Sequence, residues 1–179
     1  TVKHLLSHRS GLPNYTYFCG EYLSDTVRSL SNQHMLNIMV KHKPKAYLNP
    51  GLRFNYSNTN YALLALIIEK ISQKSYSSFL REDLFIPLGM NHSYTALNID
   101  STKEHLTCGY TMKYACVAND CYDGVLGDKG IYTTTYDLFL LRIFLLLFPL
   151  KFPLLLLSIL HQVSSFRILV LQCRDRIDR

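Results

Sequence analysis

Apolar residues recur at helical spacing in several stretches of the chain, and polar turns separate these stretches. Residues 1–9 predict a short helix with an apolar stripe, which Gly11 and then Pro13 end. Ser31 stands at the N-cap position of a second predicted helix, which extends to about Lys41. An Asn-Pro-Gly sequence ending at position 51 then predicts a turn.

The clearest helix in the sequence is predicted over residues 58–72. Asn58 or Thr59 is expected to be its N-cap, because both side chains can accept a hydrogen bond from a free amide of the first turn. Leucine, isoleucine and alanine residues occupy nearly every face of this segment, so we expect a helix that is deeply buried.

The second half of the chain alternates between shorter elements. A helix is expected from about Ser77 to Phe85, where a following proline and glycine end it. Residues 92–125 read as short strands and loops, and three glycines follow in a turn-rich stretch. A last helix is expected to start near position 136, with Thr134 or Thr135 as its N-cap.

The character of the chain changes at about residue 139. Residues 138–160 are almost entirely leucine, isoleucine and phenylalanine, and residues 161–179 are basic without a clear pattern. We therefore expect one domain over residues 1–138 and an aberrant tail over residues 139–179, produced by a reading-frame change or a misjoined end. Two alternatives stay open for the apolar segment: a membrane anchor, which its prolines and its central lysine disfavour, and a divergent surface helix.

Charge and cysteine content narrow the classes of function. The 179 residues carry a formal charge of +6, of which residues 138–179 contribute +4. The remaining basic residues are scattered among acids without a basic stripe, so we expect no nucleic-acid partner. The five cysteines form no metal-like pairs, although Cys116 and Cys121 could close a small disulfide loop in an exported protein. No leader is visible at Thr1, so the compartment stays open.

Candidate chemistry is concentrated in the segment that leads into the predicted buried helix. There a Pro-Gly turn delivers a short extended stretch with Tyr56 and Asn58 at the mouth of the helix, a rigid place for a phenol and an amide. A tyrosine acts as a general base or proton relay when a nearby cation lowers its pKa. An asparagine amide can both donate and accept, so it can orient a cation and a substrate carbonyl together. Read alone, the Tyr-x-Asn sequence is a weak signal and is more typical of a turn tyrosine followed by an N-cap asparagine.

Four stretches in one order give this segment a context: residues 1–13 (TVKHLLSHRSGLP), 50–61 (PGLRFNYSNTNY), 85–90 (FIPLGM) and 124–134 (GVLGDKGIYTT). Together they resemble the β-lactamase and penicillin-binding-protein superfamily of serine hydrolases, which includes class C β-lactamases, DD-peptidases, esterases and D-aminopeptidases. The resemblance implies an α/β (α+β) β-lactamase-like fold. It also implies that the chain is an internal piece of it, holding mostly the helical part and the Tyr-x-Asn wall of the cleft.

The resemblance also implies a chemistry. In such enzymes a serine attacks an amide or ester carbonyl, and a lysine three residues later manages the proton together with a tyrosine. Tyr56 and Asn58 match the family's Tyr-x-Asn element. The Ser-x-x-Lys element is absent, since neither Ser10 nor Ser72 has a lysine at the third following position, and we expect it upstream of Thr1. The third element, a Lys/His-x-Gly strand, has no match in residues 139–179.

These observations predict a serine hydrolase whose 179 residues are inactive by themselves, with a small-molecule or peptide amide or ester as substrate. The competing hypothesis is a non-catalytic ligand-binding or scaffold protein, with or without a membrane tether, that keeps the fold without the nucleophile. His4 and His8 have a spacing that can bind zinc, but no third ligand is evident, and we expect neither metal nor cofactor. Asp128 and Lys129 could reach the rim of the site, but a solvated turn is the simpler interpretation.

Overall fold

The structure is a computed structural model that describes residues 1–23, 29–98, 109–110, 116–117 and 121–147. Its helical elements are α1 (Val2–Leu6), α2 (Tyr15–Phe18), η1 (Cys19–Tyr22), α3 (Asn32–His42), α4 (Asn58–Ser72), α5 (Tyr76–Phe79), η2 (Leu80–Phe85), η3 (Ala96–Asn98) and α6 (Thr135–Leu147). The strands are β1 (Tyr94–Thr95), β2 (Gly109–Tyr110), β3 (Cys116–Val117) and β4 (Ile131–Tyr132). β1 pairs antiparallel with β4, and β2 with β3.

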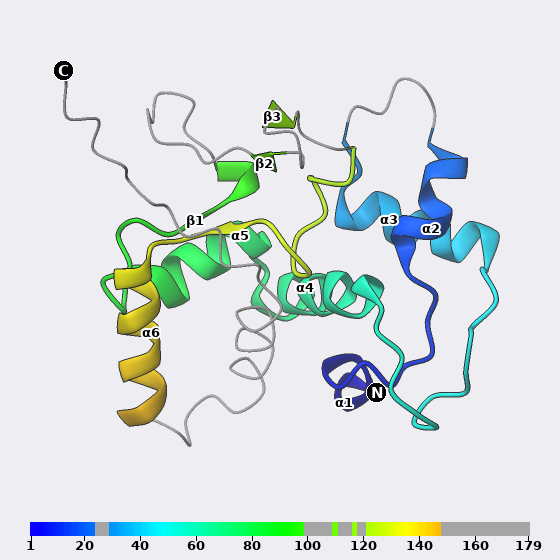
Figure 1. Cartoon of the computed structure of the whole chain (residues 1–179), viewed down its shortest axis with the longest axis horizontal. Helices are drawn as coiled ribbons and strands as arrows, with labels where there is room; N and C mark the ends of the chain where they lie inside the picture. The colour runs from blue at the N-terminus through cyan, green and yellow to red at the C-terminus, as the bar shows by residue number, and fades with distance from the viewer. Residues whose placement is uncertain (24–28, 99–108, 111–115, 118–120, 148–179) are drawn as a thin grey trace.

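Helix α4 is the centre of the described structure, and other helices pack around it (Figure 1). α1 lies along one side of it, α2 and α3 lie near its N-terminal half, and α5 follows its C-terminal end. α6 is at the far end of the molecule in this view (Figure 1). The first half of α4 is therefore enclosed on several sides, while the second half reaches the surface.

Two apolar clusters meet at α4. One contains Ala62 together with Tyr15, Met35 and other buried residues of the α2–α3 side. The other contains Ala65 together with buried residues of α5, η2 and α6. Small residues at these two positions let neighbouring elements approach the α4 backbone closely, as close packing of protein interiors requires.

The segment 121–130 crosses over α4 and is held there by the side chain of Asn32. The Asn32 amide donates to the carbonyl of Ala62 at 3.0 Å and to that of Leu126 at 2.6 Å, and its oxygen accepts from the Leu126 amide at 2.8 Å. Gly127 has φ of 104°, and a Cβ there would lie 2.5 Å from the carbonyl oxygen of Tyr61. Only glycine allows the backbone to approach α4 this closely.

Most of the helices expected from the pattern are present. α1 is present but ends at Leu6, short of the predicted end at residue 9, and α3 has Ser31 as its N-cap, with the hydroxyl accepting from the amide of His34 at 3.2 Å. α6 begins at Thr135, and the hydroxyl of Thr134 accepts from the amide of Asp137 at 3.2 Å. The segment predicted from Ser77 begins one residue earlier, at Tyr76, because Ser75 caps it.

Two expectations for α4 were wrong. Its N-cap is Ser57, not Asn58 or Thr59. The helix is also not buried all round, because Ile71 is 79% exposed near its C-terminal end. The apolar pattern predicted more burial than the structure shows, because α4 is longer than the elements that cover it. Within the described structure, its last turn is exposed to solvent. Exposed single apolar residues of this kind are common on protein surfaces.

The apolar segment that begins at residue 138 is described only in part. α6 continues through the proposed boundary at residues 138–139 and extends to Leu147, while residues 148–179 lie outside the described part of the chain. No helix within the described ranges combines the length and the apolar character that crossing a bilayer would require. The division at residue 138 therefore stays a prediction.

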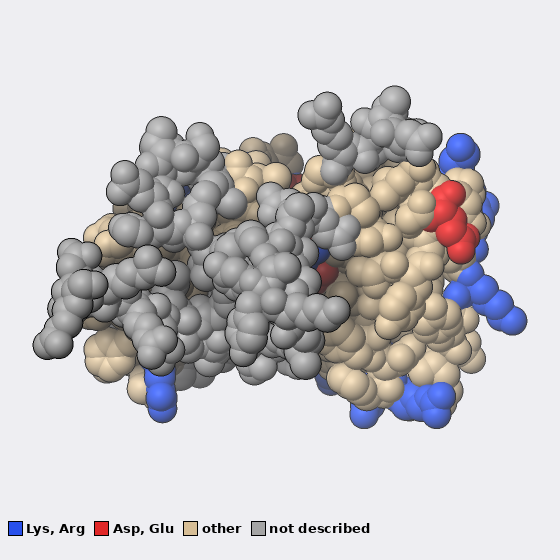
Figure 2. Space-filling model, turned by 45° about the horizontal axis from the view of Figure 1, so that its top comes forward, with Lys and Arg blue, Asp and Glu red and all other residues tan. Residues whose placement is uncertain are grey.

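Charged side chains are dispersed over the face shown in Figure 2. Lysine and arginine side chains stand near the edges of the described surface, separated by uncharged residues (Figure 2). Two exposed acids of η2, Glu82 and Asp83, share the ammonium of Lys74 at 3.0 and 2.7 Å. The absence of a nucleic-acid partner remains an expectation drawn from the sequence.

Candidate active site

Tyr56 lies in the extended stretch just before α4, with its side chain 48% exposed. Its ring packs against that of His8, with the ring centroids 4.5 Å apart and the planes inclined by 35°. The Tyr56 hydroxyl makes no hydrogen bond with any residue that the structure describes. Within the described structure the phenol is therefore oriented by ring packing, and about half of the residue is exposed.

His8 is buried and supports Tyr56 from beneath. It follows α1 in the left-handed region, with φ of 49°. Its Nδ1 lies 3.3 Å from the backbone amide nitrogen of Ser57 and 3.1 Å from the side-chain nitrogen of Asn60. Because the Ser57 amide can only donate, Nδ1 is an acceptor, and the neutral ring carries its proton on Nε2.

Two further aromatic rings enclose His8. The ring of Tyr61 lies on it at 5.0 Å between centroids, and that of Phe54 meets it edge-on at 5.8 Å. The Tyr61 hydroxyl donates to the carbonyl oxygen of Leu6 at 3.0 Å. Burial raises the pKa of Tyr61 to about 12, and the neighbouring Tyr56 adds to this shift. His8 is thus the centre of an aromatic cluster that joins α1 to α4.

Hydrogen bonds from the first turn of α4 hold the segment after His8. Asn60 accepts from the hydroxyl of Ser10. The Thr59 hydroxyl donates to the carbonyl of Pro13 at 2.7 Å and accepts from the amide of Tyr15 at 2.8 Å. The sequence stretches 1–13 and 50–61 are therefore brought together, although neither predicts the contact by itself.

The backbones of these stretches also run close together. The amide of Gly51 donates to the carbonyl of Arg9 at 2.8 Å, and that of Tyr47 donates to the carbonyl of Gly11 at 2.9 Å. A Cβ on Gly11 would lie only 1.9 Å from the carbonyl oxygen of Leu48. Glycine at position 11 is required because the neighbouring backbone occupies the space of a side chain.

Asn58 is the first residue of α4 and is partly buried. Its side chain makes no hydrogen bond with the described residues, so it does not cap the helix. The capping role predicted for Asn58 or Thr59 is wrong because the hydroxyls of Ser57 and Thr59 both donate to the carbonyl of Pro13. Within the described part of the chain, the Asn58 amide therefore stands at the mouth of the helix without a hydrogen-bond partner.

The electrostatic environment keeps Tyr56 protonated. Burial raises the pKa of Tyr56, and the carboxylate of Asp128 raises it further. A phenol that acts as a general base needs the opposite shift, which a nearby cation would supply. The described residues contribute no such cation, so a lowered pKa of Tyr56 requires a positive charge from elsewhere.

Asp128 is not the solvated turn residue that the sequence suggested. Its Oδ2 accepts from the hydroxyl of Tyr15 at 2.9 Å, while the Lys129 ammonium lies 3.0 Å from Asp123. Burial raises the pKa of Asp128 to about 6, although the bond from Tyr15 and the charge of Lys129 act in the opposite direction. Burial also raises the pKa of Tyr15, and Asp128 adds to that effect.

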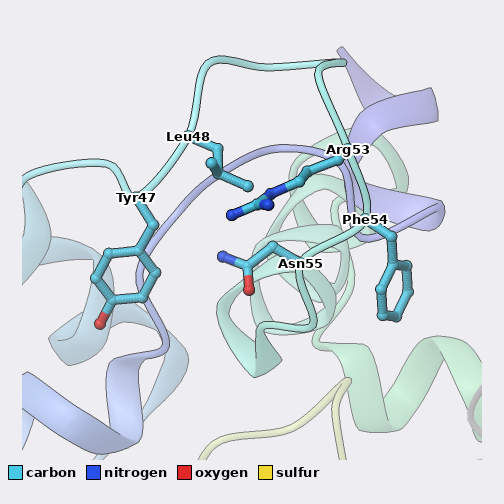
Figure 3. A pocket seen from close by; sticks show the side chains of 5 residues that line it. All are labelled: Tyr47, Leu48, Arg53, Phe54 and Asn55. Atoms are coloured by element: carbon cyan, nitrogen blue, oxygen red, sulfur yellow. The ribbon is translucent and has the colours of Figure 1, made fainter.

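An open hollow of about 380 Å³ lies beside this site and is lined by Tyr47, Leu48, Arg53, Phe54 and Asn55. Figure 3 shows Leu48, Arg53 and Asn55 converging, while the ring of Phe54 points away from them (Figure 3). Phe54 instead reaches the ring of His8. Tyr56 does not line this hollow, so the hollow differs from the cleft that the sequence predicts beside Tyr56.

No metal site is evident in the described ranges, where no three His, Cys, Asp or Glu side chains gather as ligands. The spacing of His4 and His8 suggested zinc, but Nδ1 of His8 is engaged by Ser57 and Asn60. Sequence reasoning missed the part played by His8 and Asn60 in holding Tyr56. It also missed the Tyr15–Asp128 bond, for which the sequence carries no local signal.

Comparison with known proteins places the chain in a family. The model of the β-lactamase family matches residues 1–156. The chain belongs to the β-lactamase family. The β-lactamase-like fold expected from the sequence is thereby confirmed, and the described part of the chain is its mostly helical portion.

Several individual proteins are similar to this chain. A penicillin-binding protein of Bacillus subtilis is 32% identical over 157 residues, covering 78% of this chain and 34% of that relative. The octameric penicillin-binding protein homologue of Pyrococcus abyssi superposes with a TM-score of 0.63 at 30% identity, covering 80% of this chain and 34% of that one. The D-amino acid amidase of Ochrobactrum anthropi SV3, complexed with L-phenylalanine, gives a TM-score of 0.63 at 26% identity, covering 82% and 42%. The chain spans about a third of the length of the Bacillus subtilis relative.

Proposed function

We propose that the chain forms part of a serine hydrolase that cleaves amide or ester bonds, with Tyr56 as the proton-carrying phenol and Asn58 as the amide that orients the substrate carbonyl. The observation that supports this proposal is the position of Tyr56. Its ring packs against buried His8, and its hydroxyl makes no hydrogen bond to the described residues at the mouth of α4. A group held in this way is oriented before the substrate arrives.

The reaction proceeds in two steps. The oxygen of a serine bonds to the substrate carbonyl carbon, the bond to the leaving group breaks, and the proton of the serine passes by way of Tyr56 to the leaving amine or alcohol. Water then hydrolyses the acyl-enzyme to the acid and the free serine. The serine and its partner lysine belong to a Ser-x-x-Lys element, which no serine in these 179 residues provides.

The lysine of that element also answers the electrostatic requirement of Tyr56. An ammonium beside the phenol would lower the pKa of Tyr56, against the effects of burial and of Asp128. Tyr56 would then accept the serine proton and pass it to the leaving group in the first step, and in the second it would accept a proton from the attacking water and return it to the serine. Without the lysine, the phenol keeps its proton at neutral pH and cannot serve as a base.

For the substrate we propose a small amide or ester derived from an amino acid or a short peptide. The likeness to the D-amino acid amidase supports this class. The chain without a Ser-x-x-Lys should hydrolyse none of these substrates by the family mechanism. The alternative, a ligand-binding or scaffold protein with the same fold, would lack the element in the longer protein as well.

The test compares two proteins: the 179-residue chain, and an extended protein in which this chain is joined to its upstream sequence. Nitrocefin, a p-nitrophenyl ester and D-phenylalanine p-nitroanilide serve as substrates. We expect saturable turnover only in the extended protein, with an acyl group trapped on a serine upstream of Thr1. An acyl group on a serine of the 179 residues, or an extended protein without a Ser-x-x-Lys and without turnover, would contradict the proposal.

A further inference from the structure

The carboxylate of Asp128 lies at the same end of α4 as Tyr56. It follows Gly127, whose backbone rests against the carbonyl of Tyr61 in the first turns of that helix. Tyr15 also connects the first turn of α4 to Asp128, because its amide donates to Thr59 and its hydroxyl donates to Asp128. These contacts position Asp128 beside the mouth of the helix.

Only one of the two Asp128 oxygens has a donor among the described residues. Oδ2 accepts from Tyr15 at 2.9 Å, and the backbone amide of Asp128 itself also favours the carboxylate, whereas Oδ1 is buried and accepts no hydrogen bond from another described residue. The nearest lysine in sequence, Lys129, directs its ammonium to Asp123 at 3.0 Å. A buried carboxylate oxygen without a donor is costly, so this arrangement indicates that a donor is supplied from outside the described residues.

The charge of Asp128 also reaches the proposed catalytic phenol. Among the groups that raise the pKa of Tyr56, Asp128 is the charged one. Burial raises the pKa of Asp128 to about 6, so the carboxyl group is ionised at neutral pH. The unused oxygen is therefore an anionic acceptor within electrostatic range of the reacting group.

We propose that Oδ1 of Asp128 receives the ammonium group of an amino-acid-derived substrate whose scissile carbonyl is held at Tyr56. The inference rests on the proposed function and names the substrate feature that the same site selects. In an amino acid amide or ester the amino group is one carbon away from the carbonyl. A carboxylate beside the group that serves the carbonyl is thus suitably placed to bind it. A charge-assisted hydrogen bond to this ammonium completes the coordination of Asp128.

Two substrates that differ only in the amino group test the proposal in the extended protein. D-phenylalanine p-nitroanilide carries the ammonium, and hydrocinnamoyl p-nitroanilide lacks it. The variant Asp128→Asn keeps the shape of the side chain and removes its charge. We expect the ratio of kcat/KM for the first substrate to that for the second to fall about 10- to 100-fold, the worth of a hydrogen bond to a charged group, because any effect of the lost charge on Tyr56 acts on both substrates alike.

Two control variants separate recognition from general effects. Asp83→Asn removes an exposed carboxylate of η2 that pairs with Lys74, and it should leave both substrates unaffected. Tyr15→Phe removes the donor to Oδ2 but keeps the carboxylate, so the ratio of the two kcat/KM values should stay within about threefold of the wild-type ratio. If Asp128→Asn lowers kcat/KM equally for both substrates, Asp128 only supports the fold or binds a resident lysine. If kcat/KM falls for neither substrate, Asp128 binds no substrate group. Either result overturns the proposal.

A second measurement needs no variant. Phenethylamine should inhibit turnover of hydrocinnamoyl p-nitroanilide at least about tenfold more strongly than phenethyl alcohol does, because only the amine is a cation at neutral pH. Equal inhibition would overturn the proposal even if Asp128→Asn failed to fold. If the wild-type protein hydrolyses neither anilide, the proposed function fails. Binding of D-phenylalaninamide, measured by calorimetry, then tests the ammonium site by itself. Weaker binding to Asp128→Asn than to the wild type supports the site, and equal binding contradicts it.

Discussion

The ring of His8 packs against that of Tyr56, with centroids 4.5 Å apart and planes inclined by 35°. His8 lies two residues after the end of the first helix of the chain, whereas Tyr56 precedes the central helix α4. The buried imidazole is itself oriented by Ser57 and Asn60, which donate to its Nδ1. The orientation of the exposed phenol therefore depends on a hydrogen-bonded residue beneath it and on no bond of its own hydroxyl within the described structure.

Tyr56→Phe should separate catalysis from stability. The substitution keeps the ring on His8 and removes a hydroxyl that makes no hydrogen bond within the described residues. The free energy of unfolding should therefore change by less than about 0.5 kcal/mol. Loss of general acid–base assistance should lower kcat/KM of the extended protein by about 10²- to 10⁴-fold. The measurements are steady-state kinetics and the thermal midpoint. Near-wild-type turnover would show that Tyr56 is a turn residue without a catalytic role.

Asn58→Ala and Asn60→Ala should affect different properties of the extended protein. Asn58 makes no capping bond, so its loss should change stability by no more than about 0.5 kcal/mol while lowering kcat/KM. Asn60 is buried and bonded to Ser10 and His8, so its loss leaves buried polar groups without partners and should cost about 1–3 kcal/mol. Chemical denaturation of both variants checks the prediction. Equal destabilisation would contradict the assignment of the cap to Ser57.

Asn32→Ala should destabilise the protein by releasing segment 121–130 from α4. The side chain makes three hydrogen bonds, to Ala62 and to both backbone groups of Leu126, and their loss should cost about 1–3 kcal/mol. Asn37→Ala is a matched control on the same helix, because Asn37 is exposed and bonded to Gln33. Urea denaturation should show a change below about 0.5 kcal/mol for the control. Similar midpoints for the two variants would show that Asn32 does not hold the segment.

The free energy of unfolding should depend on pH because Asp128 titrates differently in the folded and the unfolded protein. Burial raises the pKa of this carboxyl in the folded state to about 6, whereas an unfolded aspartate titrates near about 3.9. The unfolded chain therefore binds fewer protons between these values, and the contribution of Asp128 to stability is lost as the pH rises through this window. Relative to Asp128→Asn, the wild-type thermal midpoint should fall as the pH rises from about 4 to about 7. A difference that stays constant across this range would show that Asp128 titrates normally.

The local pattern predicted the helices well where a helix end is determined by neighbouring residues. Ser31 and Thr134 cap α3 and α6 as expected, because an N-cap forms between residues two or three positions apart. The prediction failed at α4. There Ser57 and Thr59 donate to Pro13, and the choice between a local amide and a distant carbonyl is not visible in a short segment.

The residues of the candidate site were predicted unevenly for a similar reason. Tyr56 and Asn58 were selected from a short motif and its resemblance to a family, and their catalytic roles stay predictions. Asp128 was read as a solvated turn because glycines and a lysine surround it in sequence. Its bond to Tyr15 depends on α2 and the segment 121–130 meeting over α4, a contact that local sequence does not reveal.

By itself the sequence determined the membership of this chain in the β-lactamase family, the existence of its main helices and the absence of a Ser-x-x-Lys among its 179 residues. These properties depend on residue identity and on spacing along one segment. The tertiary structure decided which groups surround Tyr56: the ring of His8 beneath it and the charge of Asp128 beside it. Burial and hydrogen bonding change the pKa and the orientation of a side chain through contacts in space, and those contacts exist only after α4 has gathered the separate segments around it.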